Sequence, residues 1–376
     1  MPSIPRVVVL GGAGHFGSRI CRSLANEAGI EILVAGRNLA RSQAYAEVLR
    51  GRAKANLYAV QLDHSAADFE ERLSSLDPTV VVNTAGPFQG QDYRVARACI
   101  ACASHYMDLA DGREFVASFG QLDELARRQN VLLVSGASTL PAVSSAVIEK
   151  FRSRFETIRG IEISIAPANK TPRGAGTIAA VLSYCGKPFQ WLRDGRWETA
   201  YGWQDLKTHS YPSLGRRWLG ACDVPDLTLF PKHYPDVETV TFHAALELAW
   251  QQFGLWAMAW PVRLDLMTDW SKHVKWFKRM SDRFESMGTD TGGMHVRIWG
   301  DDSEQRSRSL TWYLTAHRNH GPEIPCVPAI LLTRRLIRGE IARRGAHPCI
   351  EFITLDEFDD AVSDFDISWT VVEGER

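Results

Sequence analysis

The chain has 376 residues, of which 45% are hydrophobic and 23% charged, a balance that is ordinary for a globular protein of about two domains. Its formal net charge of −1 argues against nucleic acid or an anionic membrane surface as the main partner. Seven scattered cysteines and a strand that follows almost directly on Met1 lead us to expect free thiols, no leader peptide and a cytoplasmic location.

The first predicted unit is a strand, a glycine-rich turn and a helix. The β-branched run Arg6–Leu10 leads into Gly11–Gly17, and apolar residues then recur at helical spacing. In this context a G-x-G-x-x-G match predicts dinucleotide binding, although a glycine-rich turn that binds nothing is the alternative. Gly12 would make the tight turn, Gly14 would admit a pyrophosphate and Gly17 would let the helix pack closely. The phosphates would face the helix N-terminus, so the expected cofactor-binding residues are Gly12, Ala13, Gly14, His15, Phe16 and Gly17.

The end of the second predicted strand bears on the choice of nicotinamide cofactor. Glu31–Ala35 is followed by the turn Gly36–Asn38 and a second helix. An acid at this position binds the ribose 2′-hydroxyl of NAD, whereas an arginine accommodates the 2′-phosphate of NADP. Arg37 occupies the position and Arg41 follows one turn later, and a planar guanidinium suits a phosphate. The pattern favours NADP over NAD, with solvated surface arginines as the alternative.

The next two strands add further cofactor candidates. Strand Leu57–Asp63 ends in a carboxylate that would meet the adenine edge, and helix capping by Asp63 is an equal alternative. Strand Pro78–Asn83 opens into a turn of small residues that would let the chain pass close to the ribose and nicotinamide. The residues expected to border the cofactor there are Thr84, Ala85, Gly86, Pro87 and Phe88.

Strands continue to alternate with helices as far as residue 140. The expected elements are two helices and two strands, namely Tyr93–Ala103, Arg113–Gln129, His105–Leu109 and Asn130–Val134. Pro141 suits the first turn of a further helix that ends near Phe151. This alternation predicts an α/β fold with a Rossmann-type, doubly wound parallel sheet. Cys99 and Cys102 lie in a predicted helix without a His/Cys cluster, so buried thiols are favoured and no metal site is expected.

The second half has a different core chemistry, because all twelve tryptophans lie at or after Trp191. We expect a second α+β domain with a mixed or antiparallel sheet, and domains at 1–150, 151–325 and 326–376, the last with helices that pack back on the first. Analogy with two-domain dehydrogenases suggests a homodimer. Two strands are expected, at Gly160–Ile165 and Asp366–Val372. Two hairpins are expected, one turning at Asp194-Gly195 and one formed by Thr291–Ile298 with Arg308–Ala316. Helices are expected at Pro325–Arg338 and after the capping box Thr354–Glu357.

Two further segments of this half attract functional interpretations. The loop Pro167–Gly176 places Lys170 and Arg173 before a helix start, which makes them candidates for binding a substrate carboxylate; a mobile basic loop is as good an interpretation. Ala244–Trp260, which Pro261 would end, is the most hydrophobic predicted helix. It is too short and too polar to span a bilayer, and a buried or interface helix is favoured over membrane-surface binding.

Several of these motifs together resemble the saccharopine dehydrogenase-like family. They are Gly11–Gly17, Gly36–Asn38, Asn83–Phe88, the stretch from Ala98 to Asp108, and Gly136–Pro141, within residues 5–150. The resemblance implies an NADP-binding Rossmann domain, a second domain with much of the substrate site, and hydride transfer at a C–N bond such as an imine. It implies that Gly12–Gly17 hold the pyrophosphate, Arg37 the 2′-phosphate, and that Thr84–Phe88 border the nicotinamide. Asp111–Glu114 departs from the family's Gly-Glu pair, so the amino-acid substrate is not expected to carry over.

The Asn83–Gly86 segment also resembles the N-x-A-G element of short-chain dehydrogenases. That family relies on a Tyr-x-x-x-Lys pair, in which the lysine lowers the pKa of the tyrosine. No tyrosine of this chain has a lysine four residues on, since Tyr184 and Lys187 are three apart. The short-chain interpretation is therefore disfavoured.

The reaction needs a proton donor or a polarising group beside the cofactor, which carries the hydride. Asp108 is the first candidate for a catalytic residue, from its place at a strand end and from the family resemblance, and a capping or salt-bridged aspartate is the alternative. Weaker candidates are Asp111, Ser138, Lys170, Tyr184 and His317. We expect an NADP-dependent oxidoreductase that acts on a small C=N or C=O substrate, and no nucleic-acid partner or membrane span. The alternative is a non-catalytic NADP-binding sensor.

Overall fold

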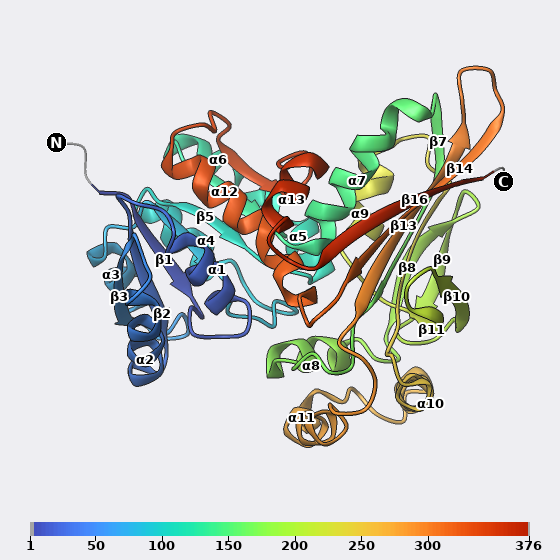
Figure 1. The fold of residues 1–376 in the computed structure, drawn as a ribbon, viewed down its shortest axis with the longest axis horizontal. Coiled ribbons are helices and arrows are strands. Elements are labelled where there is room, and N and C mark those ends of the chain that lie inside the picture. Colours follow the sequence, from blue (N-terminus) through green and yellow to red (C-terminus); the bar gives the residue numbers. More distant parts are fainter. Residues whose placement is uncertain (1–3, 375–376) are drawn as a thin grey trace. The chain divides into compact units, whose positions relative to one another are not determined.

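The computed structural model describes residues 4–374, which divide into two compact units (Figure 1). Unit 1 comprises residues 4–143 and Glu323–Ile353, and unit 2 comprises Ser144–Pro322 and residues 354–374. The division differs from the expected one at both ends. Residue 150 lies inside helix α7 (Ser144–Phe151) of unit 2. The last strand, β16 (Ile367–Gly374), pairs with a strand of unit 2, which places the end of the described chain there.

Unit 1 is built on a seven-stranded sheet whose order is β15-β6-β5-β4-β1-β2-β3. Each neighbouring pair is parallel, which confirms the predicted doubly wound fold. The β-branched runs form the central strands because both faces of such a sheet are buried. The strands are β1 (Arg6–Leu10), β2 (Glu31–Gly36), β3 (Asn56–Gln61), β4 (Val80–Asn83), β5 (His105–Asp108), β6 (Leu132–Ser135) and β15 (Gly345–Pro348).

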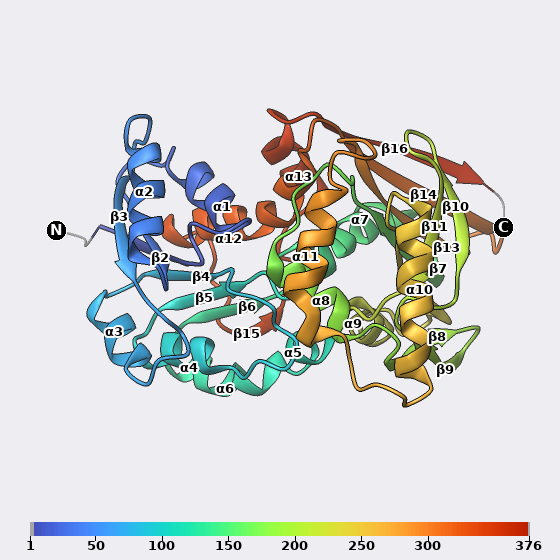
Figure 2. The same cartoon turned by 90° about the horizontal axis from the view of Figure 1, so that it is seen from below.

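The helices of unit 1 cover the two faces of this sheet (Figure 2). They are α1 (Gly17–Leu24), α2 (Leu39–Arg50), α3 (Phe69–Ser75), α4 (Arg94–Ala101), α5 (Arg113–Ala117), η1 (Phe119–Leu122), α6 (Asp123–Arg128) and α12 (Val327–Ile337). The expectation of one helix over Arg113–Gln129 is wrong. A 3₁₀ turn interrupts it and brings Phe119 and Leu122 fully into the core.

The helix expected to begin at Pro141 begins three residues later. The turn η2 (Thr139–Val143) contains Leu140 in an extended conformation, with φ −120° and ψ 126°. A residue that precedes proline is driven out of the helical region by the pyrrolidine ring. The regular helix therefore starts only at Ser144.

Unit 2 is built on a nine-stranded mixed sheet with the main order β10-β11-β12-β7-β13-β14-β16. Its strands are β7 (Thr157–Ala166), β8 (Pro188–Arg193), β9 (Arg196–Tyr201), β10 (Lys207–Tyr211), β11 (Gly215–Ala221), β12 (Thr239–Ala244), β13 (Gly292–Asp301), β14 (Ser307–Ala316) and β16. Both predicted hairpins are present, and Asp194 and Gly195 turn the first with φ of 48° and 75°. One face of β14 is buried at Leu310, Trp312 and Leu314.

Helices pack on this sheet and extend beyond it. They are α7, α8 (Ala175–Ser183), α9 (Asp226–His233), α10 (Ala249–Arg263), α11 (Val274–Arg283) and α13 (Leu355–Val362), with short 3₁₀ turns η3 (Arg152–Arg154), η4 (Ser271–His273) and η5 (Gly321–Cys326). Pro261 does not end α10 as expected, because in the last turn a proline removes only one helical hydrogen bond. The capping box of Thr354 and Glu357 opens α13 as predicted. Within residues 4–374, no helix is long and apolar enough to cross a membrane.

Candidate functional site

The carboxyl ends of β1 and β4 meet at the point where the strand order of unit 1 reverses. Leu10 lies opposite Asn83 in the parallel register, and the chain then enters Gly11–Gly17 on one side and Thr84–Phe88 on the other. The backbone N–H of Thr84 donates to the Leu10 carbonyl at 3.0 Å. Open α/β sheets bind their ligands outside such a switch point. The two loops predicted to hold the cofactor therefore start side by side.

The glycines of the first loop are required by packing. A Cβ on Gly12 would lie 2.9 Å from the Val9 carbonyl oxygen, and one on Gly14 would lie 2.8 Å from that of Gly11. A Cβ on Gly17 would overlap the Gly11 carbonyl. Gly11 itself has φ of +75°, and a Cβ there would lie 2.7 Å from Thr84 Oγ1. Gly11, which the motif does not include, is thus a fourth constrained position.

The N-terminus of α1 presents unpaired donors. Phe16 at the N-cap provides no side-chain cap. Among the described residues, the backbone N–H groups of Ala13, His15 and Phe16 have no hydrogen-bond acceptor. Such groups, together with the helix dipole, form an anion-binding site. Burial and the neighbouring Arg19 lower the pKa of His15 to about 4, so its imidazole is neutral near the loop.

Two cations of α1 are compensated by a residue from far along the chain. Glu323 Oε1 lies 3.1 Å from Arg19 Nε and 2.6 Å from Arg22 Nη2. Arg19 also donates to the His15 carbonyl. The anchored Arg19 thus stiffens the loop, and Glu323 offsets its charge. Sequence reasoning missed Glu323 because it lies some 300 residues from its partners.

The loop after β2 carries two exposed guanidinium groups. Neither Arg37 nor Arg41 forms an ion pair with a residue that the structure describes. Asn38 caps α2 by accepting the backbone N–H of Arg41 at 3.0 Å, and the Arg37 carbonyl accepts from Gln61 at 3.2 Å. These bonds hold the backbone and leave both cationic side chains available for an anion.

Asp63 lies two residues beyond the end of β3. Its Oδ1 accepts from the backbone N–H of Ser65 at 3.0 Å and from its hydroxyl at 2.7 Å. These hydrogen bonds lower the pKa of Asp63, and Arg37 contributes a smaller effect. The contacts correspond to the local turn-capping role, and they leave the carboxylate ionised close to Arg37.

The loop after β4 is divided between surface and core. Gly86 and Pro87 are exposed, while Phe88 is 4% exposed and packs on Phe115 with ring centroids 5.5 Å apart. Gln91 Nε2 donates to the carbonyls of Ala85 and Pro87, and these two hydrogen bonds fix the conformation of the loop. Phe88 anchors this segment from the core.

Asp108 is fully buried at the end of β5. Its Oδ1 accepts from the backbone N–H groups of Gly136 at 2.8 Å and Ala110 at 2.9 Å, and from the Ser135 hydroxyl at 3.0 Å. Burial raises the pKa of Asp108 to about 6 although these donors oppose the shift. Its Oδ2 has no hydrogen-bond partner among the described residues. The carboxyl therefore joins the ends of β5 and β6 and has no surface that a substrate could reach.

Other proton-donor candidates are held by local contacts. Asp111 Oδ1 accepts from Gln89 at 3.1 Å. Tyr184 stacks on Trp203, with ring centroids 6.5 Å apart and planes at 8°. His317 Nδ1 lies 3.1 Å from Thr291 Oγ1. Asp111 belongs to unit 1, and the other two belong to unit 2.

In unit 2 the loops that follow β7 and β12 converge on Glu247, whose side chain is 7% exposed. Its carboxylate accepts from the backbone N–H groups of Asn169 at 2.7 Å and Thr289 at 2.9 Å, and it lies 3.6 Å from Arg217 Nη2. Glu247 thereby positions the loop that carries the predicted substrate residues. The sequence offered no signal for this role beyond an acid near a helix start.

The two predicted substrate residues differ in their surroundings. Lys170 has an exposed side chain, and its backbone N–H donates to the Thr289 carbonyl at 3.0 Å. Arg173 is partly buried, its Nη1 lies 3.5 Å from Asn169 Oδ1, and its buried Nη2 has no partner among the described residues. Burial lowers the pKa of Arg173, and Glu247 and Glu285 oppose this. An unpaired, partly desolvated guanidinium nitrogen is a donor that an anionic ligand would satisfy.

A second polar cluster of unit 2 joins β10 to β7 and β13. Glu162, His209 and His295 bring one potential ligand atom each within 4.8 Å of the others. The two imidazole rings, however, stack at 4.1 Å with planes at 19°, so one ion cannot lie in both ring planes. Lys207 already donates to Glu162 at 2.7 Å. Burial lowers the pKa of His209 to about 4, so it stacks as a neutral ring, and we interpret the cluster as structural.

Comparisons with known proteins agree with this architecture. Residues 7–149 match the family model described as saccharopine dehydrogenase NADP binding domain. The whole chain is similar to apo saccharopine dehydrogenase (L-Glu forming) from Saccharomyces cerevisiae, with TM-score 0.67 and 14% identity over 98% of this chain and 100% of that chain. An amine dehydrogenase from Mycobacterium smegmatis matches with TM-score 0.47 and 11% identity over 93% and 96% of the two chains. A comparison with curated protein sequences found no match.

Residues 7–149 are therefore similar to the saccharopine dehydrogenase NADP binding domain, as their motifs predict. The family match covers every cofactor-loop position described above, whereas α12 and β15 of unit 1 lie outside it. At 14% identity, the likeness to the yeast enzyme shows a shared fold.

Proposed function

We propose that the protein is an NADP-dependent oxidoreductase that transfers a hydride to or from a small C=N or C=O substrate. The observation that carries this proposal is the uncapped N-terminus of α1, whose unpaired N–H groups lie at the β1/β4 switch point. The match of residues 7–149 to an NADP-binding domain supports it.

The preference for NADP rests on the loop after β2. Arg37 stands where NAD-binding folds place an acid, and Arg41 lies one helical turn away. Both guanidinium groups lack an ion-pair partner within residues 4–374, so both remain available to a 2′-phosphate. NAD offers no charge at this position.

The bound nicotinamide supplies the hydride chemistry, and the protein supplies position and charge. Gly12–Gly17 would hold the pyrophosphate, and Thr84–Pro87 would border the nicotinamide ribose. The imidazole of His15 would be a neutral neighbour of the pyrophosphate, because its pKa is lowered to about 4. For Asp108 we infer a positioning role, because its fully buried carboxyl orders the backbone of Ala110 and Gly136 at the sheet edge.

In unit 2 we propose that Arg173 binds an anionic group of the substrate, with Lys170 as a more exposed auxiliary cation. Arg173 Nη2 is a donor without a partner in the part of the chain that the structure describes, and Asn169 and Glu247 fix the loop that carries it. A substrate with a carboxylate or a similar anionic group would satisfy that donor.

Cofactor titration is the direct test of the dinucleotide assignment. NADPH and NADH would be titrated by protein fluorescence into the wild type and the Arg37→Ala variant. We expect NADPH to bind the wild type more tightly, and the variant to lose that preference while it keeps its NADH affinity. Equal affinities in the wild type, or a preference that survives the substitution, would contradict the NADP assignment.

Turnover separates the enzyme from the NADP-binding sensor. The protein would be incubated with NADPH and a panel of imines, ketones and pairs of keto acids with amines, and NADPH absorbance would be followed. We expect oxidation with at least one carbonyl or imine class. Tight NADPH binding without oxidation across the panel would favour the sensor.

A further inference from the structure

The helix α10 turns an apolar face to solvent. Trp250 is 48% exposed, Phe253 40% and Trp260 37%, while Leu255 and Ala259 on the opposite face are buried. No charged residue occurs in this helix before its last position, Arg263. A helix that is apolar around its circumference is normally enclosed in a core or by lipid. The sequence predicted a buried or interface helix, and the structure leaves half of it uncovered.

The exposed apolar surface continues beyond α10. Leu264 is 59% exposed, Leu266 77%, Trp276 56% and Met287 46%. Of the thirteen large hydrophobic side chains exposed in the described chain, seven lie between residues 250 and 287. Such a concentration marks a binding surface, whereas isolated exposed hydrophobic residues are ordinary.

The aromatic residues of this segment contact one another across its elements. The rings of Trp250 and Phe284 lie 4.9 Å apart, and those of Trp270 and Phe277 lie 6.1 Å apart. Trp270 Nε1 donates to the Met258 carbonyl of α10 at 2.8 Å. Figure 2 shows α10 and α11 on the same side of unit 2. Since α11 has no buried residue, it lies on the surface along its whole length.

The second half of this surface is strongly basic. Within Ser271–Arg283, five of the six charged residues are cations, although the whole chain carries −1. The single acid, Asp282, pairs with Lys278 of the same helix. The flanking acids Asp269 and Glu285 lie outside this stretch, and Asp269 accepts from Ser271 to shape the turn before α11. The local charge is therefore complementary to an anionic partner.

These observations discriminate between two occupants, a second copy of the chain and a lipid surface. A twofold dimer through this face would pair two copies of the same patch, each with an excess of cations, and these like charges would repel one another. Tryptophan and lysine are suited to the boundary between headgroups and acyl chains, where the rings enter and the amines reach the phosphates. The combination favours an anionic bilayer.

We propose that residues 249–287 of unit 2, here called the aromatic–basic surface, bind the surface of an anionic lipid bilayer. Trp250, Phe253, Trp260 and Trp276 enter the boundary between headgroups and acyl chains. Lys272, Lys275 and Arg279 contact the lipid phosphates. The protein then lies on the bilayer, in agreement with the finding that no described helix could span one.

Vesicle co-sedimentation tests this proposal with the full chain. Wild type should sediment with phosphatidylcholine vesicles that contain phosphatidylserine, and much less with phosphatidylcholine alone. The Trp250→Ser/Trp276→Ser variant should lose binding about tenfold or more, because each substitution removes a large interfacial side chain. Trp197→Ser is the matched control, since Trp197 is 54% exposed on β9, outside the surface.

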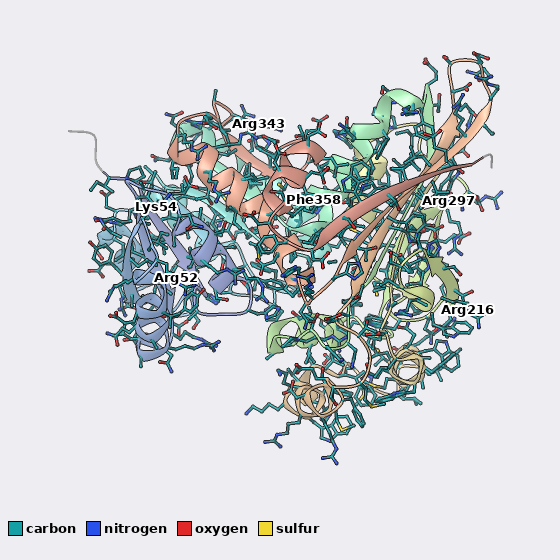
Figure 3. All side chains as sticks on the ribbon, in the orientation of Figure 1. Arg52, Lys54, Arg216, Arg297, Arg343 and Phe358 are labelled. Atoms are coloured by element: carbon teal, nitrogen blue, oxygen red, sulfur yellow. The ribbon has the colours of Figure 1, made fainter. Side chains whose placement is uncertain are left out.

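A charge-reversal pair separates electrostatics from insertion. Lys275→Glu/Arg279→Glu should lower binding to phosphatidylserine vesicles about tenfold or more, and added salt should have the same effect on wild type. Arg52→Glu/Lys54→Glu, at exposed residues of unit 1 that Figure 3 labels, is the control that should bind as wild type does. The urea unfolding midpoint should be unchanged in all four variants, which verifies that each is folded.

Two results would overturn the proposal. One is wild-type protein that does not sediment with either vesicle. The other is a Trp250→Ser/Trp276→Ser variant that sediments as wild type does, or that changes only from dimer to monomer in light scattering, which would identify a contact between copies.

Discussion

Thr84 Oγ1 donates a hydrogen bond of 2.7 Å to the carbonyl oxygen of Leu10, the last residue of β1. The same carbonyl accepts the backbone N–H of Thr84, so the loop after β4 is joined twice to the strand that precedes the glycine-rich turn. The Thr84 hydroxyl also occupies the space that a side chain at Gly11 would need. The two cofactor loops are therefore held together by direct contacts, and a substitution in either loop is expected to change the conformation of both.

A side chain at Gly17 should abolish cofactor binding and destabilise unit 1. A Cβ there meets the Gly11 carbonyl, and overpacking of this kind costs about 1–3 kcal/mol. Gly17→Ala should lower the urea unfolding midpoint and remove the NADPH-dependent fluorescence change. Gly51→Ala, at the C-cap of α2 with no atom within 4 Å of its Cβ, is the control and should behave as wild type does. NADPH binding by Gly17→Ala at wild-type affinity would contradict the prediction.

Reversing the charge at Arg37 should invert the cofactor preference. An aspartate there would repel the 2′-phosphate of NADP and could accept from the 2′-hydroxyl of NAD. Charge-assisted hydrogen bonds contribute about 1.5–3 kcal/mol, so Arg37→Asp should weaken NADPH about tenfold to a hundredfold. Isothermal titration with both cofactors measures the change. The prediction fails if NADPH and NADH affinities fall equally.

Asp108 should tolerate asparagine but not alanine. The Asn side chain retains an oxygen for Gly136, Ala110 and Ser135, whereas Ala leaves three buried donors unsatisfied at a cost of about 3 kcal/mol. Urea unfolding should show the loss in Asp108→Ala alone. With a substrate in hand, Asp108→Asn should keep kcat within a few-fold and leave KM unchanged. A folded Asp108→Asn protein that binds NADPH but has lost turnover would instead make Asp108 a catalytic residue.

Asp226 should make stability fall as pH rises towards neutrality. Burial raises the pKa of this carboxyl to about 7, with the Ser144 hydroxyl as a hydrogen-bond donor that opposes the shift. The folded chain thus holds a proton that the unfolded chain releases at its ordinary pKa. The stabilisation is complete below about pH 4 and is lost as pH rises through about 7, with a total of about 4 kcal/mol.

The Asp226→Asn variant isolates this effect. Asparagine has no proton to lose, so the variant should show a flatter stability profile between about pH 4 and pH 7. The pKa of Asp108 is also raised by burial. Because Asp108 is present in both proteins, its effect on stability cancels in the comparison. Urea unfolding of both proteins over this range measures the difference, and parallel profiles would refute the assignment.

Removing the Arg173 guanidinium should weaken substrate without weakening cofactor. Arg173→Ala should raise KM for an anionic substrate about tenfold and leave NADPH affinity unchanged, because the loop belongs to unit 2. Lys170→Ala should have a smaller effect, since its side chain is exposed. Steady-state kinetics with a neutral substrate analogue supplies the comparison, and an equal rise in KM for the analogue would argue against carboxylate binding.

Part of the fold and of the site was predictable because local patterns determine it. The β1 strand, the Gly11–Gly17 turn and the alternation of strands and helices follow from periodicity and glycine spacing within short windows. The Asp194-Gly195 hairpin and the Thr354 capping box follow from the backbone preferences of two to four residues. Arg37 was found because the strand before it determines its position at the sheet edge.

Tertiary structure alone decided which of these groups are covered and which are paired. β15 carries no strand pattern in its sequence and joins the sheet only because β6 offers it an edge. Glu323 reaches Arg19, and Glu247 organises the Arg173 loop, through contacts between distant segments. The sequence shows that α10 is largely apolar, but only the packed fold shows that Trp250 faces solvent and that Asp108 is fully buried. The physical reason is that burial and ion pairing depend on which remote segments meet, whereas local sequence specifies only backbone preferences and the chemical character of each face.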